Sequence, residues 1–221
     1  MFKLDKYLSN LLDKLKDVFG TRLLYMGLQG SYLRNEADEN SDIDIMVIID
    51  DMAVHDLKEY KKAIASVGYL EKACGFICGK KEMANWNPLE ICHLLHTTKD
   101  LYGKLADFIP SYTAKNVKDY IKLSLGNMFH ELCHRYIYSD KDKNIARLPN
   151  TYKTVFFILQ NMHYISNGTF IATKEELIKH LKDEDKEVME MAIELKNSSD
   201  YDFEYAFELL YTWCQKSLNN I

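Results

Sequence analysis

Residues 23–51 read LLYMGLQGSYLRNEADENSDIDIMVIIDD, and the other elements can be placed around this stretch. An apolar run ends at Gly30 and Ser31, and ten mostly polar residues separate it from Asp42, Ile43 and Asp44 at the start of a second apolar run. The first run, residues 22–29, is too short for an independent helix and stops at a turn, which predicts a buried strand. The second, residues 43–49, is rich in β-branched residues and predicts the next strand.

The two aspartates of this stretch share one face of the predicted strand. Side chains at positions i and i+2 of a strand project to the same side, so Asp42 and Asp44 point together while Ile43 and Ile45 point away. Carboxylates are hard oxygen ligands that suit Mg²⁺, and two such ions can activate a hydroxyl and stabilise a leaving pyrophosphate. The alternative is a pair of ordinary aspartates at a strand edge.

Gly30 and Ser31 form a turn that suits phosphate oxygens. A turn between a strand and a helix start offers backbone N–H groups and a hydroxyl, and the glycine allows close approach of the backbone. The alternative is an ordinary turn. Together with the aspartates, the turn predicts a site for a phosphorylated ligand and a metal ion.

The composition limits the class of protein. The chain has 221 residues, of which 47% are hydrophobic and 28% charged, as in ordinary globular proteins. A net charge of -5 argues against broad binding to nucleic acid, which depends on neutralised phosphates. The five cysteines form no CxxC pair, and we expect reduced, mostly buried thiols. The sequence shows no signal peptide and no apolar run of transmembrane length, so we expect a cytoplasmic protein without a membrane partner.

The first half of the chain alternates predicted helices and strands. Apolar residues recur with helical spacing over residues 4–19, which end at Gly20, and over residues 55–67, which end at Gly68. We predict further strands at residues 73–78 and 90–97, separated by a KKEMANWNP segment in which Pro88 interrupts any helix.

The second half of the chain is predicted to be a helical bundle. After Pro110 the apolar residues follow helical periods, with residues 139–150 as a loop and a helix entered through Pro149, Asn150 and Thr151. Thr173 followed by Glu176 has the form of a capping box, so another helix begins there. We therefore predict an α/β (α+β) domain with a small mixed sheet at residues 1–110 and an all-α domain at residues 111–221.

The order of strand, Gly-Ser turn, Asp-Ile-Asp and strand resembles the signature of the DNA polymerase β-like nucleotidyltransferase superfamily. The added helical half is similar to antibiotic nucleotidyltransferases of the kanamycin and lincosamide type. The resemblance implies that Gly30 and Ser31 hold the phosphates of a nucleoside triphosphate such as ATP, and that Asp42 and Asp44 bind two Mg²⁺ ions. Many members of the family have an arginine near the turn, which suggests Arg34 as a further phosphate ligand.

The superfamily also implies a third carboxylate on a later strand. Glu90 is our prediction, because it interrupts the apolar PLEICHLL run that we interpret as a strand, and there it would ligate a metal and accept the proton of the acceptor. Glu71 and Glu82 are the alternatives.

Three residues of the helical half are candidates for ligand contact. Lys153 falls in the first turn of a predicted helix, where the helix dipole disfavours a cation, and this mismatch suggests a phosphate partner. Glu131 and His134 share a polar helix face and are candidates for acceptor binding. For each residue, an ordinary surface role is the alternative.

The resemblance implies that an Mg²⁺-dependent enzyme transfers a nucleoside monophosphate to a hydroxyl of a small molecule, with an aminoglycoside-like or lincosamide-like antibiotic as the leading acceptor. Transfer of AMP to a protein, as in minimal nucleotidyltransferase antitoxins, and a nucleotide-binding module without turnover are the alternatives. The sequence is compatible with a monomer or a homodimer.

Overall fold

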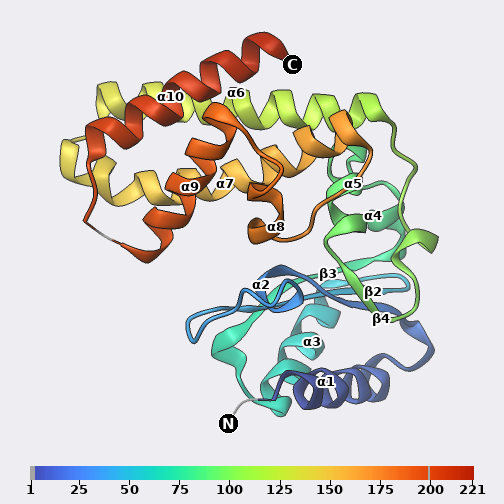
Figure 1. Cartoon of the computed structure of the whole chain (residues 1–221). Coiled ribbons are helices and arrows are strands. Elements are labelled where there is room, and N and C mark those ends of the chain that lie inside the picture. The colour runs from blue at the N-terminus through green and yellow to red at the C-terminus, as the bar shows by residue number, and fades with distance from the viewer. Residues whose placement is uncertain (1–2, 199) are drawn as a thin grey trace. The chain divides into compact units, whose positions relative to one another are not determined.

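The chain folds into two compact units, Met1–Ser111 and Tyr112–Ile221, in a computed structural model (Figure 1). The structure describes residues 3–198 and 200–221. Within these residues no helix is both long and apolar enough to cross a membrane.

The first unit combines four strands with short and long helices. Its elements, in chain order, are α1 (Leu4–Phe19), the 3₁₀ turn η1 (Gly20–Arg22), β1 (Leu23–Leu28), α2 (Gly30–Leu33), β2 (Ile43–Ile49), α3 (Val54–Val67), η2 (Leu70–Lys72), β3 (Ala73–Gly79), α4 (Lys80–Ala84), α5 (Pro88–His96), β4 (Lys99–Tyr102) and η3 (Leu105–Asp107).

The four strands form one mixed sheet in the order β3-β2-β1-β4. β1 is antiparallel to β2 and to β4, whereas β2 and β3 are parallel. The small mixed sheet expected from the sequence is thereby confirmed. Asp44 of β2 is paired with Cys74 of β3, and Leu28 of β1 with Ile45.

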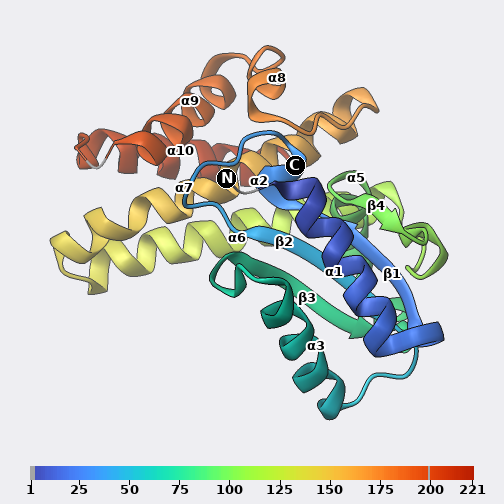
Figure 2. The same ribbon diagram turned by 90° about the horizontal axis from the view of Figure 1, so that it is seen from below.

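The two faces of the sheet carry different cores because strand side chains alternate. Ile43, Ile45, Val47 and Ile49 of β2 are buried in the core that α1 and α3 cover. Figure 2 looks onto this face and shows α1 and α3 in front of the strands. The opposite face carries a second core, which contains Met46 and Ile48 of β2 and residues of α4 and α5 among others: Tyr25, Cys78, Met83, Trp86, Leu94 and Leu105.

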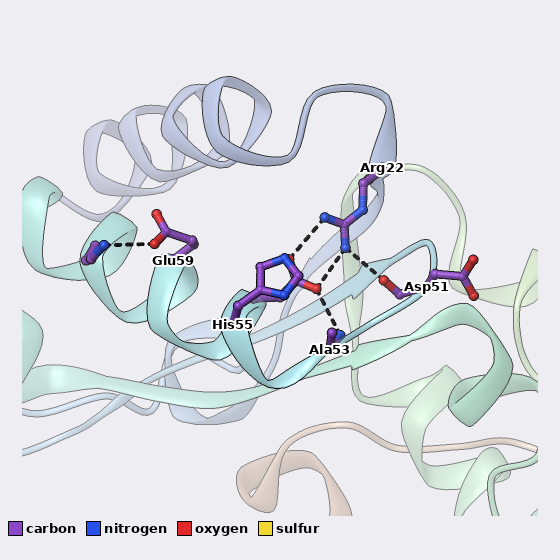
Figure 3. Close-up of polar contacts among 7 residues, drawn as sticks. Arg22, Asp51, Ala53, His55 and Glu59 are labelled. Atoms are coloured by element: carbon purple, nitrogen blue, oxygen red, sulfur yellow. Dashed lines mark hydrogen bonds and ion pairs between the residues drawn. The ribbon is translucent and has the colours of Figure 1, made fainter.

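An ion pair ties the start of β1 to the start of α3. Arg22 donates from Nη1 and Nη2 to the two carboxylate oxygens of Asp56, at 3.0 and 2.8 Å, and from Nη2 to the carbonyl oxygen of Asp51 at 2.8 Å (Figure 3). Asp56 also accepts from the Ala53 N–H at 2.9 Å, which caps the first turn of α3. The Arg22 guanidinium holds the pKa of Asp56 down at about 2.

The predicted strand at residues 90–97 is wrong, because α5 spans most of this segment. Asn87 is the N-cap and accepts a hydrogen bond from the Leu89 N–H at 3.1 Å, and Pro88 follows at the first helical position. Proline is favoured there because that N–H has no intrahelical acceptor. The expectation that Pro88 interrupts any helix in this segment is also wrong, because α5 begins at this proline.

The regular secondary structure in the described residues of the second unit is all helical. Its helices are α6 (Ala114–Tyr138), α7 (Lys141–Asn167), α8 (Lys174–Ile178), α9 (Asp183–Asn197) and α10 (Phe203–Asn220). α7 packs against α6 and α9, and α10 packs against α6 (Figure 1). Thr173 caps α8 by accepting from the Glu176 N–H at 3.3 Å, which confirms the helix start expected at this threonine.

The predicted loop at residues 139–150 is also wrong, because α7 begins at Lys141 and includes Pro149. Asp140 is its N-cap and accepts from the Lys143 N–H at 3.1 Å. A proline inside a helix leaves the carbonyl four residues earlier without its usual donor. That carbonyl belongs to Ile145, and the Tyr201 hydroxyl donates to it at 2.6 Å. A tertiary contact therefore lets the helix continue through Pro149.

The cysteines are all free thiols. Cys78, Cys92 and Cys214 are buried, Cys133 is partly buried and Cys74 is exposed. The expectation of reduced, mostly buried thiols agrees with this distribution except at Cys74.

Candidate functional site

Gly30 and Asp44 lie in direct contact at the end of β1. Gly30 has a φ of 71°, which favours glycine, and it begins the single helical turn α2. A β-carbon added to Gly30 would overlap the carboxylate of Asp44 and come within 2.8 Å of its Cγ atom. The Gln29 N–H donates to the Asp44 carbonyl at 2.9 Å, so the two strands hold the turn against the aspartate. The sequence suggested this proximity, and the structure brings the two residues together.

The Asp42 and Asp44 side chains differ in burial. Asp42 is exposed just before β2, whereas Asp44 is half-buried within the strand. Burial raises the pKa of Asp44, and the Asp42 charge raises it further, while a hydrogen bond with the Cys74 thiol and the charge of Arg34 lower it. A cation near the two carboxylates would remove the cost of this repulsion.

The loop between α2 and β2 is held by its own polar contacts. The Asp38 carboxylate accepts from the Asn40 N–H at 2.9 Å and from the Ser41 hydroxyl at 3.1 Å. Arg34 donates from Nε to Glu36 at 2.9 Å and its side chain is 13% exposed. Asp42 lies at the end of this loop, directly before β2, and Arg34 lies close enough to Asp44 for its charge to lower the pKa of that carboxylate.

Cys74 is a site residue that the sequence reasoning missed. It is paired with Asp44 in the parallel ladder of β2 and β3, so both side chains project from the same face of the sheet. Burial of the thiol group and the charge of Asp44 raise the pKa of Cys74. The strand at residues 73–78 was predicted, but its pairing register with β2 was not, and only the register places the thiol beside the carboxylate.

His93 is a second residue that the sequence did not indicate. It projects from α5, and burial lowers its pKa to about 4, with the charges of Arg34 and His96 acting in the same direction. The influence of Arg34 places His93 in the neighbourhood of the Asp44 site. The mistaken strand at residues 90–97 concealed this helix face.

The three candidate glutamates have described neighbours other than Asp44. Glu90 is exposed in the first turn of α5 and accepts from the Trp86 indole N–H at 2.7 Å. Glu82 follows Gly79, which pairs with Ile49 at the opposite end of β2 from Asp44. Glu71 acts on Tyr7 of α1, where its charge raises the pKa of the phenol. The choice of Glu90 was motivated by a predicted strand, and this segment forms the helix α5.

The candidates of the helical unit have other neighbours. Lys153 is exposed in the interior of α7, so the first-turn argument for a phosphate partner is wrong. Glu131 forms an ion pair with Arg135 and accepts from the Thr151 hydroxyl at 3.4 Å. His134 is exposed, and its ring centroid lies 5.9 Å from that of His130 and 5.0 Å from that of Tyr138.

The donor set fits a hard cation with few protein ligands. Within the described residues no group of three or more His, Cys, Asp and Glu side chains is arranged to hold a metal ion. Asp42 and Asp44 supply two carboxylates, and Mg²⁺ commonly takes one or two carboxylates and completes its shell with water and substrate phosphates. The exposed Asp42 and the half-buried Asp44, whose charges repel one another, fit such an ion.

A family model described as a nucleotidyltransferase domain matches residues 8–81, which include the turn, both aspartates and the strand of Cys74. The chain therefore contains a nucleotidyltransferase domain, the domain of a class of transferase enzymes, as the sequence motif predicted. No curated protein matches the chain.

One solved structure extends the likeness of fold to nearly the whole chain. A crystal structure of spectinomycin adenyltransferase AAD(9) from Enterococcus faecialis with ATP and spectinomycin superposes with a TM-score of 0.63 at 13% sequence identity, covering 98% of this chain and 100% of that chain. A toxin-antitoxin structure with AMP-PNP matches with a TM-score of 0.36 at 22% identity, covering 52% of this chain and 88% of that one. The first of these structures shows that the fold of the chain is similar to that of spectinomycin adenyltransferase.

Proposed function

We propose that the protein transfers a nucleoside monophosphate from a nucleoside triphosphate, with ATP as the first candidate, to a hydroxyl group of a small molecule. The acceptor oxygen forms a bond to the α-phosphorus, the bond from that phosphorus to the bridging oxygen breaks, and pyrophosphate leaves while the acceptor loses its proton. The observation that carries the proposal is the contact between Gly30 and Asp44, which joins a phosphate-sized turn to a carboxylate pair within a nucleotidyltransferase domain.

In this proposal different residues of the site bind the phosphates and the metal ion. The backbone at Gly30 and the Ser31 hydroxyl receive phosphate oxygens, and Arg34 contributes a cation near the same point. Asp42 and Asp44 hold Mg²⁺, which when bound neutralises phosphate charge and favours loss of the acceptor proton. Two carboxylates can serve two such ions where phosphate oxygens and water complete both shells.

The acceptor is proposed by analogy of fold. The structural neighbour was solved with ATP and spectinomycin, and an aminoglycoside-like or lincosamide-like antibiotic remains the leading class of acceptor for this chain. His134 stays a candidate for acceptor contact, while Glu131 is engaged by Arg135 and Thr151. Transfer to a protein hydroxyl is the alternative within the same chemistry.

A nucleotide-binding module without rapid turnover is the second candidate function. The specific observation that favours it is Cys74, because the strand position facing Asp44 carries a thiol and not a carboxylate base. A thiol is a poorer ligand for Mg²⁺ than a carboxylate.

Transfer and binding are separated by one set of assays. Pure protein is incubated with ATP labelled at the α-phosphate, Mg²⁺ and a panel of aminoglycoside and lincosamide acceptors, and labelled product and pyrophosphate are measured. We expect product with one acceptor, its loss by at least about a hundredfold in Asp44→Asn, and no change in Asp13→Asn, an exposed aspartate of α1. Equal activity of Asp44→Asn and Asp13→Asn would contradict the proposed site.

Cys74→Asp decides between the two candidates. If the thiol limits turnover, the added carboxylate should increase transfer or the affinity for Mn²⁺ in the presence of a non-hydrolysable triphosphate. Glu90→Gln is tested alongside it, because full activity of this variant would show that Glu90 is not a catalytic residue. Saturable triphosphate binding with no product in either the original chain or Cys74→Asp would support the binding module.

A further inference from the structure

The helical unit contains two adjoining cavities, and none of their lining residues is assigned to nucleotidyl transfer above. The larger, of about 460 Å³, lies among the last part of α7, the start of α9 and the second half of α10. The smaller, of about 220 Å³, lies between α9 and α10. Glu184 and Trp213 line both cavities, so the two adjoin. The larger volume is in the range of small-molecule sites.

Carboxylates dominate the charged side chains of the two walls. The larger cavity has two lysines, and one of them, Lys216, forms an ion pair with Glu184. The smaller cavity has no lysine among its described lining residues. The carboxylates that line one or both cavities are Asp183, Glu184, Asp185, Glu187 and Glu208. Five carboxylates against two lysines leave a negative surface, which attracts cations.

Asp185 is the carboxylate most withdrawn from water. It is half-buried, and its Oδ1 accepts from the Trp213 indole N–H at 2.7 Å. Burial raises the pKa of Asp185, and the charges of Glu184 and Asp183 raise it further. An ammonium group beside this carboxylate would offset both effects. Asp183 has a φ of 48°, an unusual backbone conformation for a residue other than glycine and one that is often found at binding sites.

The remaining walls of the larger cavity are apolar or uncharged. Trp213 and Leu159 are buried core residues that also line it, and Leu181 adds aliphatic surface. The rings of His163 and His180 lie 5.4 Å apart, and burial lowers the pKa of His163. An uncharged His163 does not neutralise the carboxylates at pH 7. A ligand of this cavity therefore needs both cationic groups and apolar surface.

We propose that the adjoining cavities bind an organic polycation whose ammonium groups are separated by apolar carbon atoms. A simple metal ion would leave the apolar walls unused, and an anion would be repelled by the carboxylates. The two cavities contain none of the residues assigned above to the triphosphate or the acceptor, so the proposal does not depend on nucleotidyl transfer.

Spermidine is the test ligand, and Trp213 is the reporter. The chain has two tryptophans, so Trp86→Phe leaves Trp213 as the single tryptophan, which can be excited selectively over the tyrosines. Spermidine is titrated against its fluorescence and by calorimetry, and 1,8-octanediol serves as a neutral molecule of matched length. We expect a saturable change with spermidine and none with the diol. Asp185→Asn should weaken binding by roughly tenfold, since it removes a charge-assisted hydrogen bond.

A matched control separates a built site from general attraction to an acidic protein. Asp142→Asn removes one charge from the exposed first turn of α7 outside both cavities, and it should leave the affinity within about twofold because solvent screens exposed charges that do not contact the ligand. Glu208→Gln, at an exposed residue of the smaller cavity, provides a second variant if Asp185→Asn impairs folding. Equal weakening by Glu208→Gln and Asp142→Asn would overturn the proposal, as would the absence of a saturable change with spermidine.

Discussion

Gly30 shows at the scale of one residue how backbone conformation and site geometry are combined. Its positive φ turns the chain out of β1, and its missing side chain leaves room for the Asp44 carboxylate. Either requirement alone favours glycine, but only the contact with Asp44 links the residue to ligand binding.

Gly30→Ala is expected to disrupt the site in two ways, by steric overlap with the Asp44 carboxylate and by backbone strain. The added methyl group would displace the Asp44 carboxylate, so triphosphate binding in the presence of Mg²⁺ should fall by at least about tenfold, with a loss of stability of roughly 1 kcal/mol or more. Binding is measured with a fluorescent triphosphate analogue, and stability by thermal unfolding.

Gly168→Ala is the matched control for that substitution. Gly168 has the same φ of 71°, but an added β-carbon would meet no atom within 4 Å. It should lower stability by a similar strain and leave triphosphate binding unchanged. If both variants bind triphosphate equally well, the contact between Gly30 and Asp44 has no part in the site.

At the scale of elements, prolines have opposite meanings in α5 and α7. Pro88 begins a helix because Asn87 caps it and the missing N–H is not needed. Pro149 lies inside a helix because the Tyr201 hydroxyl satisfies the carbonyl that proline leaves open. The first case is local and can be recognised in the Asn-Pro pair, whereas the second depends on a residue far along the chain.

Tyr201→Phe should therefore destabilise the helical unit by about 1 kcal/mol, because the Ile145 carbonyl loses its donor. In a Pro149→Ala background the alanine N–H can supply that donor, so the same substitution should cost measurably less. Denaturant unfolding of the four proteins of this double-mutant cycle gives the coupling. Equal costs in both backgrounds would show that Tyr201 does not compensate for Pro149.

At the scale of the whole molecule, the two units carry separate determinants of stability. The Arg22–Asp56 ion pair belongs to the first unit and the Tyr201 contact to the second, and the two share no partner. Asp56 is 1% exposed, so replacing its carboxylate by an amide removes the charge and one of the two oxygens that accept from Arg22 and the Ala53 N–H.

Stability should fall in acid through Asp56. Its pKa is about 2 in the folded chain and about 4 in an unfolded one, so the folded state binds the proton less readily. The stabilisation is fully present above about pH 4 and is lost as the pH falls through about 2. Asp56→Asn should lower stability at pH 7 by about 2 kcal/mol, and this difference should shrink in acid. A difference independent of pH would contradict the assignment.

The Asp56→Asn and Tyr201→Phe effects should add. Substitutions without shared partners usually combine within about 0.5 kcal/mol, and these two lie in different compact units. Unfolding of the double variant, followed by fluorescence and by circular dichroism, tests this. A coupling well above that limit would mean that the two determinants act on one another.

The sequence by itself determined the parts of this protein that depend on near neighbours. Strand alternation predicts Asp42 and Asp44 on one face, and the break at Gly30 and Ser31 predicts the turn, because both inferences use local geometry alone. The first helix, the strand at residues 43–49 and the cap at Thr173 are local in the same sense.

The side chains that lie next to these residues can be identified from the tertiary structure alone. The register of β2 and β3 puts Cys74 beside Asp44, α5 brings His93 toward Arg34, and Tyr201 allows α7 to continue through Pro149. Each depends on atoms that are distant in sequence, and pairing register and packing are set by the whole core. The class of reaction can therefore be predicted from a short stretch of sequence, whereas the residues that surround the motif depend on the tertiary fold.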